Sequence, residues 1–176
     1  MGSVKVRVLK LLPFCILEEG INHKYGFMKK IIRTNNKNVD FNKLIVELDA
    51  YLKVTDGEDH EFYNQFNGLD NIKNVVIAYQ DNKAAGCGAF KKFDDKTVEI
   101  KRMFVKEEYR GTKTASSILK SLENWASEKG FTKCVLETGN RQVEAIKFYK
   151  KAGYKSIPNY GQYTHMEDSN CFEKLV

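Results

Sequence analysis

The chain has 176 residues, a length typical of one domain with a buried core. Hydrophobic residues make up 42% and charged residues 30%, a composition that excludes a disordered chain and indicates a globular one. The formal net charge is +6, and no run of five or six like charges occurs, so a polyphosphate ligand explains the dispersed charge as well as a nucleic acid or a membrane surface would.

The first 27 residues contain an apolar run with a basic start. Lys10 and Pro13 interrupt this run, no small-residue cleavage site follows, and the run is too short to cross a bilayer. We therefore expect neither a signal peptide nor a membrane anchor. We interpret residues 1–27 as an appended segment of unassigned role and residues 28–176 as the domain.

The domain begins with a strand pattern over residues 29–34, followed by a helix pattern. Asp40 is the expected N-cap of this helix. Its apolar positions recur at helical spacing and are Phe41, Leu44, Ile45, Leu48, Tyr51 and Leu52. Residues 55–58 have the T-x-x-E pattern of a capping box, which predicts that a second helix begins there.

Residues 75–79 and 84–93 predict a β-hairpin around a short turn. Gly86 and Gly88 lie inside the second of these strands. A glycine inside a strand indicates a bulge or a close approach of another part of the chain, and we expect one of these here.

The central stretch, residues 97–126, predicts a strand, a short basic turn and a long helix. The helix has one apolar stripe, which consists of Ala115, Ile118, Leu119, Leu122 and Ala126. Arg110 and Lys113 lie in the turn, just before helix amides that have no partner within the helix. The stretch therefore predicts a phosphate site, and the alternative is an ordinary helix start with two solvated cations.

The last third of the chain predicts a strand over residues 133–138 and a helix over residues 140–152. Two further strand patterns follow, at residues 154–157 and 171–175. The long segment between them is rich in Tyr, Gly and Asn, and long loops of this kind are often functional.

The cysteines and histidines do not form a metal-binding pattern. Cys15, Cys87, Cys134 and Cys171 are widely spaced without a C-x-x-C pair, and the three histidines are scattered. We therefore expect no metal site, buried thiols in a reducing compartment and a cytoplasmic protein. Cys87 is not expected to be a nucleophile, because no histidine lies near it in the sequence.

Two stretches together resemble motifs of the GCN5-related N-acetyltransferases (GNAT). The first is similar to motif A, R/Q-x-x-G-x-G/A, and consists of Arg110, Gly111, Thr112, Lys113, Thr114 and Ala115. Lys113 occupies the fourth position, where Gly is usual. Residues 142–154 resemble motif B, N-x-x-A-x-x-x-Y-x-x-x-G-F/Y, with Gln142 in place of Asn. The resemblance covers roughly residues 28–176.

The resemblance implies an α/β fold with a mixed, mostly antiparallel sheet flanked by helices. It also implies direct transfer of acetyl from acetyl-CoA, a cosubstrate, to a primary amine. The residues that it assigns to CoA are Met103, Val105, Arg110, Gly111, Thr112, Lys113, Thr114, Ala115 and Gln142. In the family, backbone groups at the positions of Met103 and Val105 pair with the pantetheine arm, and the Met103 N–H is our preferred contact for the thioester oxygen.

The reaction requires a neutral amine. At pH 7 an amine with a pKa of about 10.4 is neutral in about one molecule in 2,500, a cost of about 4.6 kcal/mol, so a carboxylate base is useful. Glu99 on the central strand and Glu137 on the next are the candidates. Glu99 is preferred because period-two alternation predicts that it shares a strand face with Met103. The alternative is that one or both glutamates pair with nearby basic residues such as Lys101.

The departing thiolate needs a proton, and in the family this comes from the motif B tyrosine, which is Tyr149 here. A phenol is a weaker acid than a thiol, so this transfer is uphill by about 2 kcal/mol. The alternative interpretation is that Tyr149 is a core aromatic residue next to Phe148.

In the family the junction of the first two helices shapes the acceptor site. Here that junction is acidic and carries Asp56, Glu58, Asp59 and Glu61. These carboxylates would suit a small cationic amine, although a protein amine also fits. The alternative is a solvated loop whose acids favour a helix N-terminus. The sequence also leaves open whether the protein forms a homodimer.

Two other functions stay open beside catalysis. A CoA-binding regulatory domain without activity is one, because Lys113 and Gln142 both depart from the motifs. A basic nucleic-acid module is less favoured, because Lys and Arg spread across every predicted element and form no stripe. We expect neither a nucleic acid nor a membrane as partner.

Overall fold

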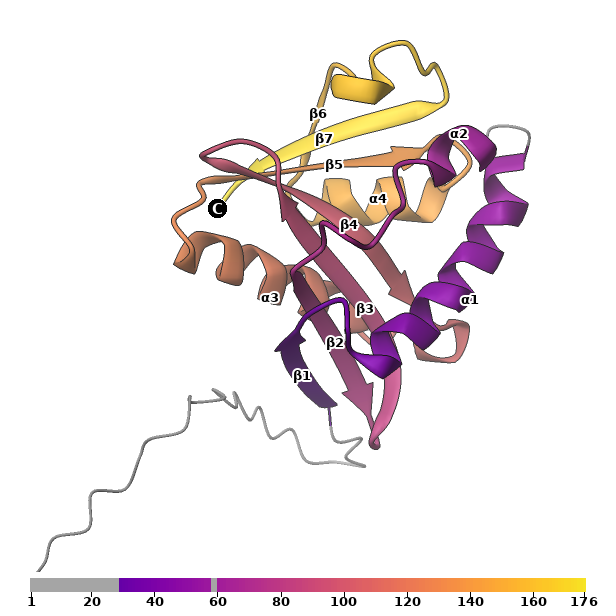
Figure 1. Ribbon diagram of the computed structural model, residues 1–176, viewed down its shortest axis with the longest axis vertical. Coiled ribbons are helices and arrows are strands. Elements are labelled where there is room, and N and C mark those ends of the chain that lie inside the picture. The colour runs from indigo at the N-terminus through magenta and orange to yellow at the C-terminus, as the bar shows by residue number, and fades with distance from the viewer. Residues whose placement is uncertain (1–28, 58–59) are drawn as a thin grey trace, which may run out of the picture.

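The computed structural model describes residues 29–57 and 60–176, which form a seven-stranded sheet with helices on both faces (Figure 1). The strands are β1 (Lys29–Thr34), β2 (Asn74–Gln80), β3 (Lys83–Lys92), β4 (Thr97–Val105), β5 (Lys133–Gly139), β6 (Lys155–Ile157) and β7 (Ser169–Leu175). Their order in the sheet is β1-β2-β3-β4-β5-β7-β6. β4 and β5 are parallel and all other neighbours are antiparallel, so the expected fold class is confirmed.

The helices lie between the strands in sequence. They are α1 (Val39–Asp56), α2 (His60–Asn64), α3 (Thr114–Glu128) and α4 (Val143–Lys151), with short 3-10 turns η2 (Glu107–Tyr109) and η3 (Gly161–Tyr163). Among the described helices, none is long and apolar enough to cross a membrane.

The N-cap of α1 is Asn38, and the expectation that Asp40 has this role is wrong. The Asn38 side chain accepts hydrogen bonds from the backbone N–H groups of Asp40 and Phe41 at 2.9 and 3.1 Å. Asn38 has extended backbone, as an N-cap requires, whereas Asp40 is already helical. The Asp40 carboxylate instead accepts a hydrogen bond from Tyr79 at 2.8 Å.

The predicted capping box at residues 55–58 is also wrong, because α1 continues through Asp56. The Thr55 hydroxyl donates to the carbonyl of Tyr51 at 3.2 Å, a bond typical of a helix interior rather than a cap. The second helix, α2, has only five residues. Glu58 and Asp59 lie outside the described residues, as do residues 1–28, which include Cys15.

Two apolar layers cover the two faces of the sheet (Figure 1). On one face, Phe41 and Leu44 of α1 are fully buried against β2 and β3. On the other face, Ile118 and Leu122 of α3 pack with Tyr149 of α4 over β3, β4 and β5. The helices therefore pack on both faces of the central strands.

β4 contains a bulge at Arg102, where φ is +58° and the register with β3 shifts. Lys101, before the bulge, pairs with Ala89, which packs in the layer under α1. Met103, after the bulge, packs in the opposite layer with α3. A bulge places an extra residue on one strand and reverses the alternation beyond it. The prediction that Glu99 and Met103 share a face is therefore wrong.

Gly88 in β3 lies next to this bulge. A Cβ atom there would overlap with the sulfur of Met103 and would lie 2.9 Å from both Ile118 and Leu122. At Gly86 a Cβ would lie 2.5 Å from the carbonyl oxygen of Phe104. The expected close approach is confirmed, because a side chain has no room against β4 at Gly86 or against β4 and α3 at Gly88.

The cysteines of the described residues, Cys87, Cys134 and Cys171, are buried free thiols in strands. Burial raises the pKa of the Cys87 thiol to about 12, which makes it a poor nucleophile. These findings agree with the expectation of structural thiols.

Candidate functional site

The candidate site forms where β4 and β5 separate. The two strands pair only at their first residues, from Thr97 with Lys133 to Glu99 with Val135. Beyond this point β5 continues beside β7, while β4 bends at its bulge. Side chains from both strands therefore point into a cavity of about 120 Å³.

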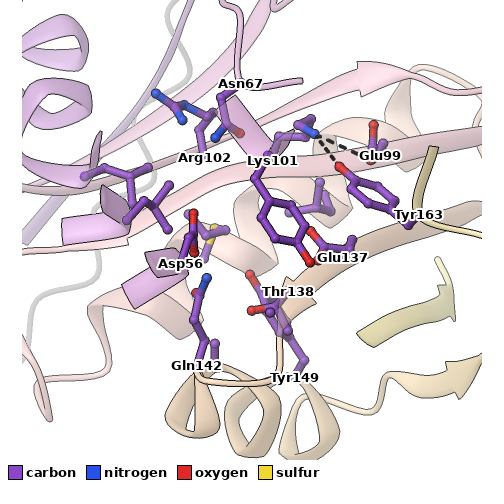
Figure 2. A pocket seen from close by; sticks show the side chains of 17 residues that line it. Asp56, Asn67, Glu99, Lys101, Arg102, Glu137, Thr138, Gln142, Tyr149 and Tyr163 are labelled. Atoms are coloured by element: carbon purple, nitrogen blue, oxygen red, sulfur yellow. Dashed lines mark hydrogen bonds and ion pairs between the residues drawn. The ribbon is translucent and has the colours of Figure 1, made fainter. Parts of the chain in front are cut away.

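The cavity is closed by helices on two sides and by the segment before β7. Its polar lining includes Asp56 of α1, Tyr63 of α2, Asn67, Glu99, Lys101 and Arg102 of β4, Glu137 and Thr138 of β5, Gln142, Tyr149 of α4 and Tyr163 of η3 (Figure 2). Apolar side chains of α1, β4 and α4 complete it: Leu48, Leu52, Ile100, Met103 and Ala145.

The structure brings five of the predicted site residues around this one cavity: Glu99, Met103, Glu137, Gln142 and Tyr149. The other predicted residues, Val105 and 110–115, lie at the end of β4 and the start of α3. The predicted catalytic and cofactor residues thus occupy two neighbouring regions joined by β4.

Glu99 is buried, with 2% of its side chain exposed, and is held by two cations. Lys91 Nζ lies 3.0 Å from Oε2, and Lys101 Nζ lies 3.6 Å from Oε1. The hydroxyl of Tyr160 donates to Oε1 at 3.3 Å. The structure thus shows the pairing with Lys101 that was the alternative to a catalytic role, in a buried rather than a surface setting.

Glu137 has a different environment. Burial raises the pKa of its carboxyl to about 7, and Asp56 and Glu99 act in the same direction. Ser169 donates a hydrogen bond to Oε1 at 2.8 Å, which lowers the pKa, as does the charge of Lys101. A carboxylate with a pKa near neutral pH can accept a proton and also release it.

Lys101 links the two glutamates. Its ammonium lies beside Glu99, donates to the hydroxyl of Tyr163 at 3.2 Å and is 5.9 Å from the centre of the Tyr163 ring (Figure 2). Burial lowers the pKa of Lys101, whereas Glu99 and Glu137 raise it. The cavity therefore contains a buried cation that the sequence analysis assigned no role.

Tyr149 lies between the core and the cavity. Its ring centre is 5.7 Å from that of Tyr154 and 6.4 Å from that of Phe172, and its side chain also lines the cavity. Burial raises the pKa of Tyr149 above its ordinary value, and the charge of Glu137 adds to this. Tyr149 is thus a core aromatic residue that also lines the cavity, and its role as an acid stays a prediction.

Two residues of the turn before α3 have left-handed backbone. Gly111 has a φ of +75° and Lys113 a φ of +65°. Lys113 is the N-cap residue of α3, and its side chain makes no capping bond. Glycine adopts a left-handed conformation without steric cost, which explains why glycine would suit this position, and here Lys113 adopts this conformation with a Cβ.

Two further cations lie at this turn, Lys29 from β1 and Arg110 from the turn itself. Lys29 of β1 donates to the carbonyl of Thr112. Arg110 donates through Nε to the carbonyl of Val105 at 3.3 Å and lies over the ring of Tyr51, 5.7 Å from its centre. Lys29 could not be found from the sequence, because 83 residues separate it from Thr112.

The acidic junction contributes less than expected. Asp56 lines the cavity, but Glu61 is exposed and does not. Lys101 and Arg102 add positive charge to the same lining. The cavity is therefore of mixed charge and not a purely anionic pocket. Within residues 29–57 and 60–176, no group of three or more His, Cys, Asp or Glu residues could hold a metal ion.

Comparison with known proteins places this geometry in a family. The model of the family described as "Acetyltransferase (GNAT) family" matches residues 42–154. An IAA acetyltransferase of Azospirillum brasilense is 31% identical over 69% of this chain and 80% of its own length. A protein named "Probable N-acetyltransferase 14" of Xenopus tropicalis is 38% identical over 46% of this chain, and the match spans only 39% of that relative.

Solved structures have the same fold. A Klebsiella pneumoniae protein assigned as an acyl-CoA N-acyltransferase has a TM-score of 0.71 and 25% identity, over 84% of this chain and 97% of its own. A GNAT acetyltransferase of Elizabethkingia anophelis with bound acetyl-CoA has a TM-score of 0.62 and 20% identity, over 84% and 98%. A PaiA N-acetyltransferase of Thermoplasma acidophilum in complex with coenzyme A has a TM-score of 0.63 and 20% identity, over 84% and 99%.

Proposed function

The chain belongs to the acetyltransferase (GNAT) family, and we propose that it transfers acetyl from acetyl-CoA to a small primary amine bound between β4 and β5. The observation that carries the proposal is the position of Glu137, a carboxyl with a pKa of about 7 that lines the same cavity as Tyr149. A proton acceptor and a proton donor are thus available around one small space.

The start of α3 suits the pyrophosphate of CoA. Gly111 and Lys113 are both left-handed, and the first turn of a helix presents amides and a partial positive charge. Lys29 contacts this turn, Arg110 belongs to it, and both add positive charge to it. The two relatives of known structure with bound acetyl-CoA or CoA support this assignment.

The edge of β4 that turns away from β5 suits the pantetheine arm. Arg110 now donates to the Val105 carbonyl, one of the two groups that would pair with the arm. Met103 lines the cavity itself, so a thioester held along β4 would place its carbonyl near the acceptor.

We assign the role of general base to Glu137 and not to Glu99. Cations already hold both oxygens of Glu99, which suits it to fixing Lys101 in the cavity wall. Glu137 faces a lysine and a serine, and its pKa of about 7 lies close to the working pH. It would accept the ammonium proton of the acceptor, directly or through one water.

We assign the role of general acid to Tyr149. Its raised pKa makes proton donation to a thiolate in water more uphill than the 2 kcal/mol estimated for an ordinary phenol. The same burial would raise the proton affinity of a thiolate formed in the cavity, which offsets this difference.

The size and lining of the cavity favour a small acceptor over a protein side chain. The space of about 120 Å³ lies beneath α2 and η3, and apolar residues alternate with charged ones around it. Glu137 and Asp56 would face the amine, while Leu48 and Leu52 would contact its carbon skeleton.

The test combines binding and turnover. Calorimetric titration of the protein with acetyl-CoA comes first, and binding at micromolar concentrations is expected. A panel of small primary amines and lysine peptides then follows, with release of the CoA thiol as readout, for the wild type and Glu137→Gln. Absence of binding up to millimolar acetyl-CoA would overturn the proposal, and binding without turnover on any amine would favour a regulatory domain.

A further inference from the structure

The Glu137 carboxylate is the end of a hydrogen-bonded chain that crosses three elements. Ser169 donates to its Oε1 at 2.8 Å, and the hydroxyl of Tyr63 lies 3.0 Å from the Ser169 oxygen. A serine hydroxyl has one hydrogen, which here is used for Glu137. When Glu137 is ionised, Tyr63 must therefore be the donor to Ser169, so the chain then runs from Tyr63 through Ser169 to Glu137.

The fold fixes this chain tightly at Ser169. This residue is the first of β7 and is paired with Gly139 in the β5–β7 ladder, two residues beyond Glu137. Only 6% of its surface is exposed. Tyr63 belongs to α2 and lines the cavity itself. The chain thus joins the buried base to a helix that forms the wall of the acceptor cavity.

We infer that Ser169 and Tyr63 are positioning residues that orient the Glu137 carboxylate toward the acceptor amine. This inference rests on the role proposed above for Glu137. The hydrogen bond from Ser169 engages Oε1 and limits rotation of the carboxylate, and Oε2 is the oxygen assigned to the ammonium proton. Tyr63 holds the Ser169 hydroxyl in the direction that this bond requires.

The surroundings of Glu137 show why one hydrogen bond matters. The titratable groups around it come from six elements: Asp56 of α1, Tyr63 of α2, Glu99 and Lys101 of β4, Tyr149 of α4, Tyr163 of η3 and Cys171 of β7. Burial, Asp56 and Glu99 favour the neutral carboxyl, whereas Ser169 and Lys101 favour the carboxylate. Loss of the Ser169 hydroxyl should therefore make Glu137 harder to ionise.

The experiment measures Glu137 directly and needs no acceptor. The full chain is labelled with ¹³C at the glutamate carboxyl carbons, and the resonance that disappears in Glu137→Gln is followed by NMR as a function of pH. We expect Ser169→Ala to move its midpoint upward by about one pH unit, and Tyr63→Phe to move it upward by less. Ser169→Thr keeps the hydroxyl and should stay near the wild-type midpoint.

Tyr79→Phe is the matched control. It also removes a tyrosine–carboxylate hydrogen bond, to Asp40 at 2.8 Å, but one that involves none of the residues around the cavity. The Glu137 midpoint should not move in this variant. If Ser169→Ala does not fold, as judged by thermal melting, Tyr63→Phe carries the test.

Kinetics separate this inference from the proposed function. With the amine that the panel identifies as substrate, the acidic limb of the pH profile of kcat/KM should move to higher pH in Ser169→Ala and Tyr63→Phe. If Glu137→Gln loses turnover but neither variant moves the midpoint or the limb, the positioning role is overturned and the base remains. If Glu137→Gln keeps wild-type turnover, both are overturned.

Discussion

Replacement of Lys113 tests whether the turn before α3 is a phosphate site. Lys113 has a φ of +65°, a left-handed conformation that costs a residue with a Cβ about 1–2 kcal/mol. Lys113→Gly removes this strain but adds about 0.5–1 kcal/mol of backbone entropy in the unfolded chain. The two effects nearly cancel, so the free energy of unfolding should rise by about 1 kcal/mol at most, equivalent to a Tm increase of about 2–4 °C.

The same variant should bind acetyl-CoA less well if the lysine contacts a phosphate. One unit charge about 4 Å from a phosphate charge contributes about 1 kcal/mol in a water-like dielectric, or about fivefold in Kd. Lys113→Gln is the matched control, because it keeps the strained backbone and loses only the charge. Calorimetric titration with acetyl-CoA at two salt concentrations measures the Kd of both variants. The difference between each Kd and that of the wild type should shrink at high salt.

The two variants together show whether the Lys113 side chain contacts a phosphate. A fivefold weakening in both, with the higher Tm only in Lys113→Gly, supports a charged contact on a glycine-like backbone. Tighter binding of acetyl-CoA by Lys113→Gly would refute it and would show that the lysine side chain obstructs the phosphate. Unchanged binding in both would place the pyrophosphate away from this residue.

The remaining predictions concern Glu137, Tyr149 and Gly88. In the wild type, kcat/KM should rise with pH through about 7 as Glu137 ionises, and Glu137→Gln should remove this limb and lower turnover at least a hundredfold. The folded pKa of Glu137, about 7, exceeds its ordinary value of 4.5, so the folded state binds more protons and Glu137 lowers stability as the pH rises from about 4.5 to about 7. Thermal melts at pH 8 should therefore show Glu137→Gln to be more stable than the wild type, by up to about 3 kcal/mol, and an equal Tm would contradict the raised pKa. Tyr149→Phe should keep the affinity for acetyl-CoA in calorimetry and lose at least tenfold in kcat, and an unchanged kcat would show that Tyr149 is not the acid. Gly88→Ala should lower the free energy of unfolding by about 1–3 kcal/mol in urea titrations, because its Cβ has no room beside Ile118 and Leu122, and a stability equal to wild type would contradict the close approach.

Local patterns were sufficient for most elements of the fold. The apolar stripe of α3 and the turn before it predicted the helix and its start, because both depend on residues within four positions of one another. The first helix showed the limit of this reasoning. Asn38 and Asp40 are both good N-caps, and the choice between them depends on the path of the chain from β1.

The candidate site was only partly predictable. The motifs identified Tyr149 and the turn before α3, but the preference for Glu99 over Glu137 depended on regular alternation along β4. The partners that distinguish the two glutamates are distant in sequence: Ser169 is 32 residues from Glu137, and Tyr160 is 61 residues from Glu99. Propensity and periodicity carry no signal over such separations, so the electrostatics of the pair became visible only in three dimensions.

On the function proposed above, the bulge at Arg102 would let one strand serve two substrates. Residues before it, Glu99 and Lys101, face the α1 layer, whereas Met103 after it faces the α3 layer, and all three line the cavity. A regular strand would put all three side chains on one face. The left-handed backbone of Arg102 costs about 1–2 kcal/mol and must be held by its surroundings.

Two contacts hold Arg102 in this conformation. The Arg102 guanidinium is paired with Asp49 of α1 at 2.6 Å with only 2% of its side chain exposed, and the Cys87 thiol donates to its carbonyl at 3.6 Å. The Asp49 side chain is 45% exposed, so solvent screens the pair, and Asp49→Ala should cost about 1–3 kcal/mol, mainly because a buried guanidinium loses a hydrogen-bond partner. Such a change would disturb Lys101 and Met103 at once, since both depend on the bulge for their direction. The acceptor and cofactor sides are therefore coupled through the backbone of a residue that need not contact either substrate.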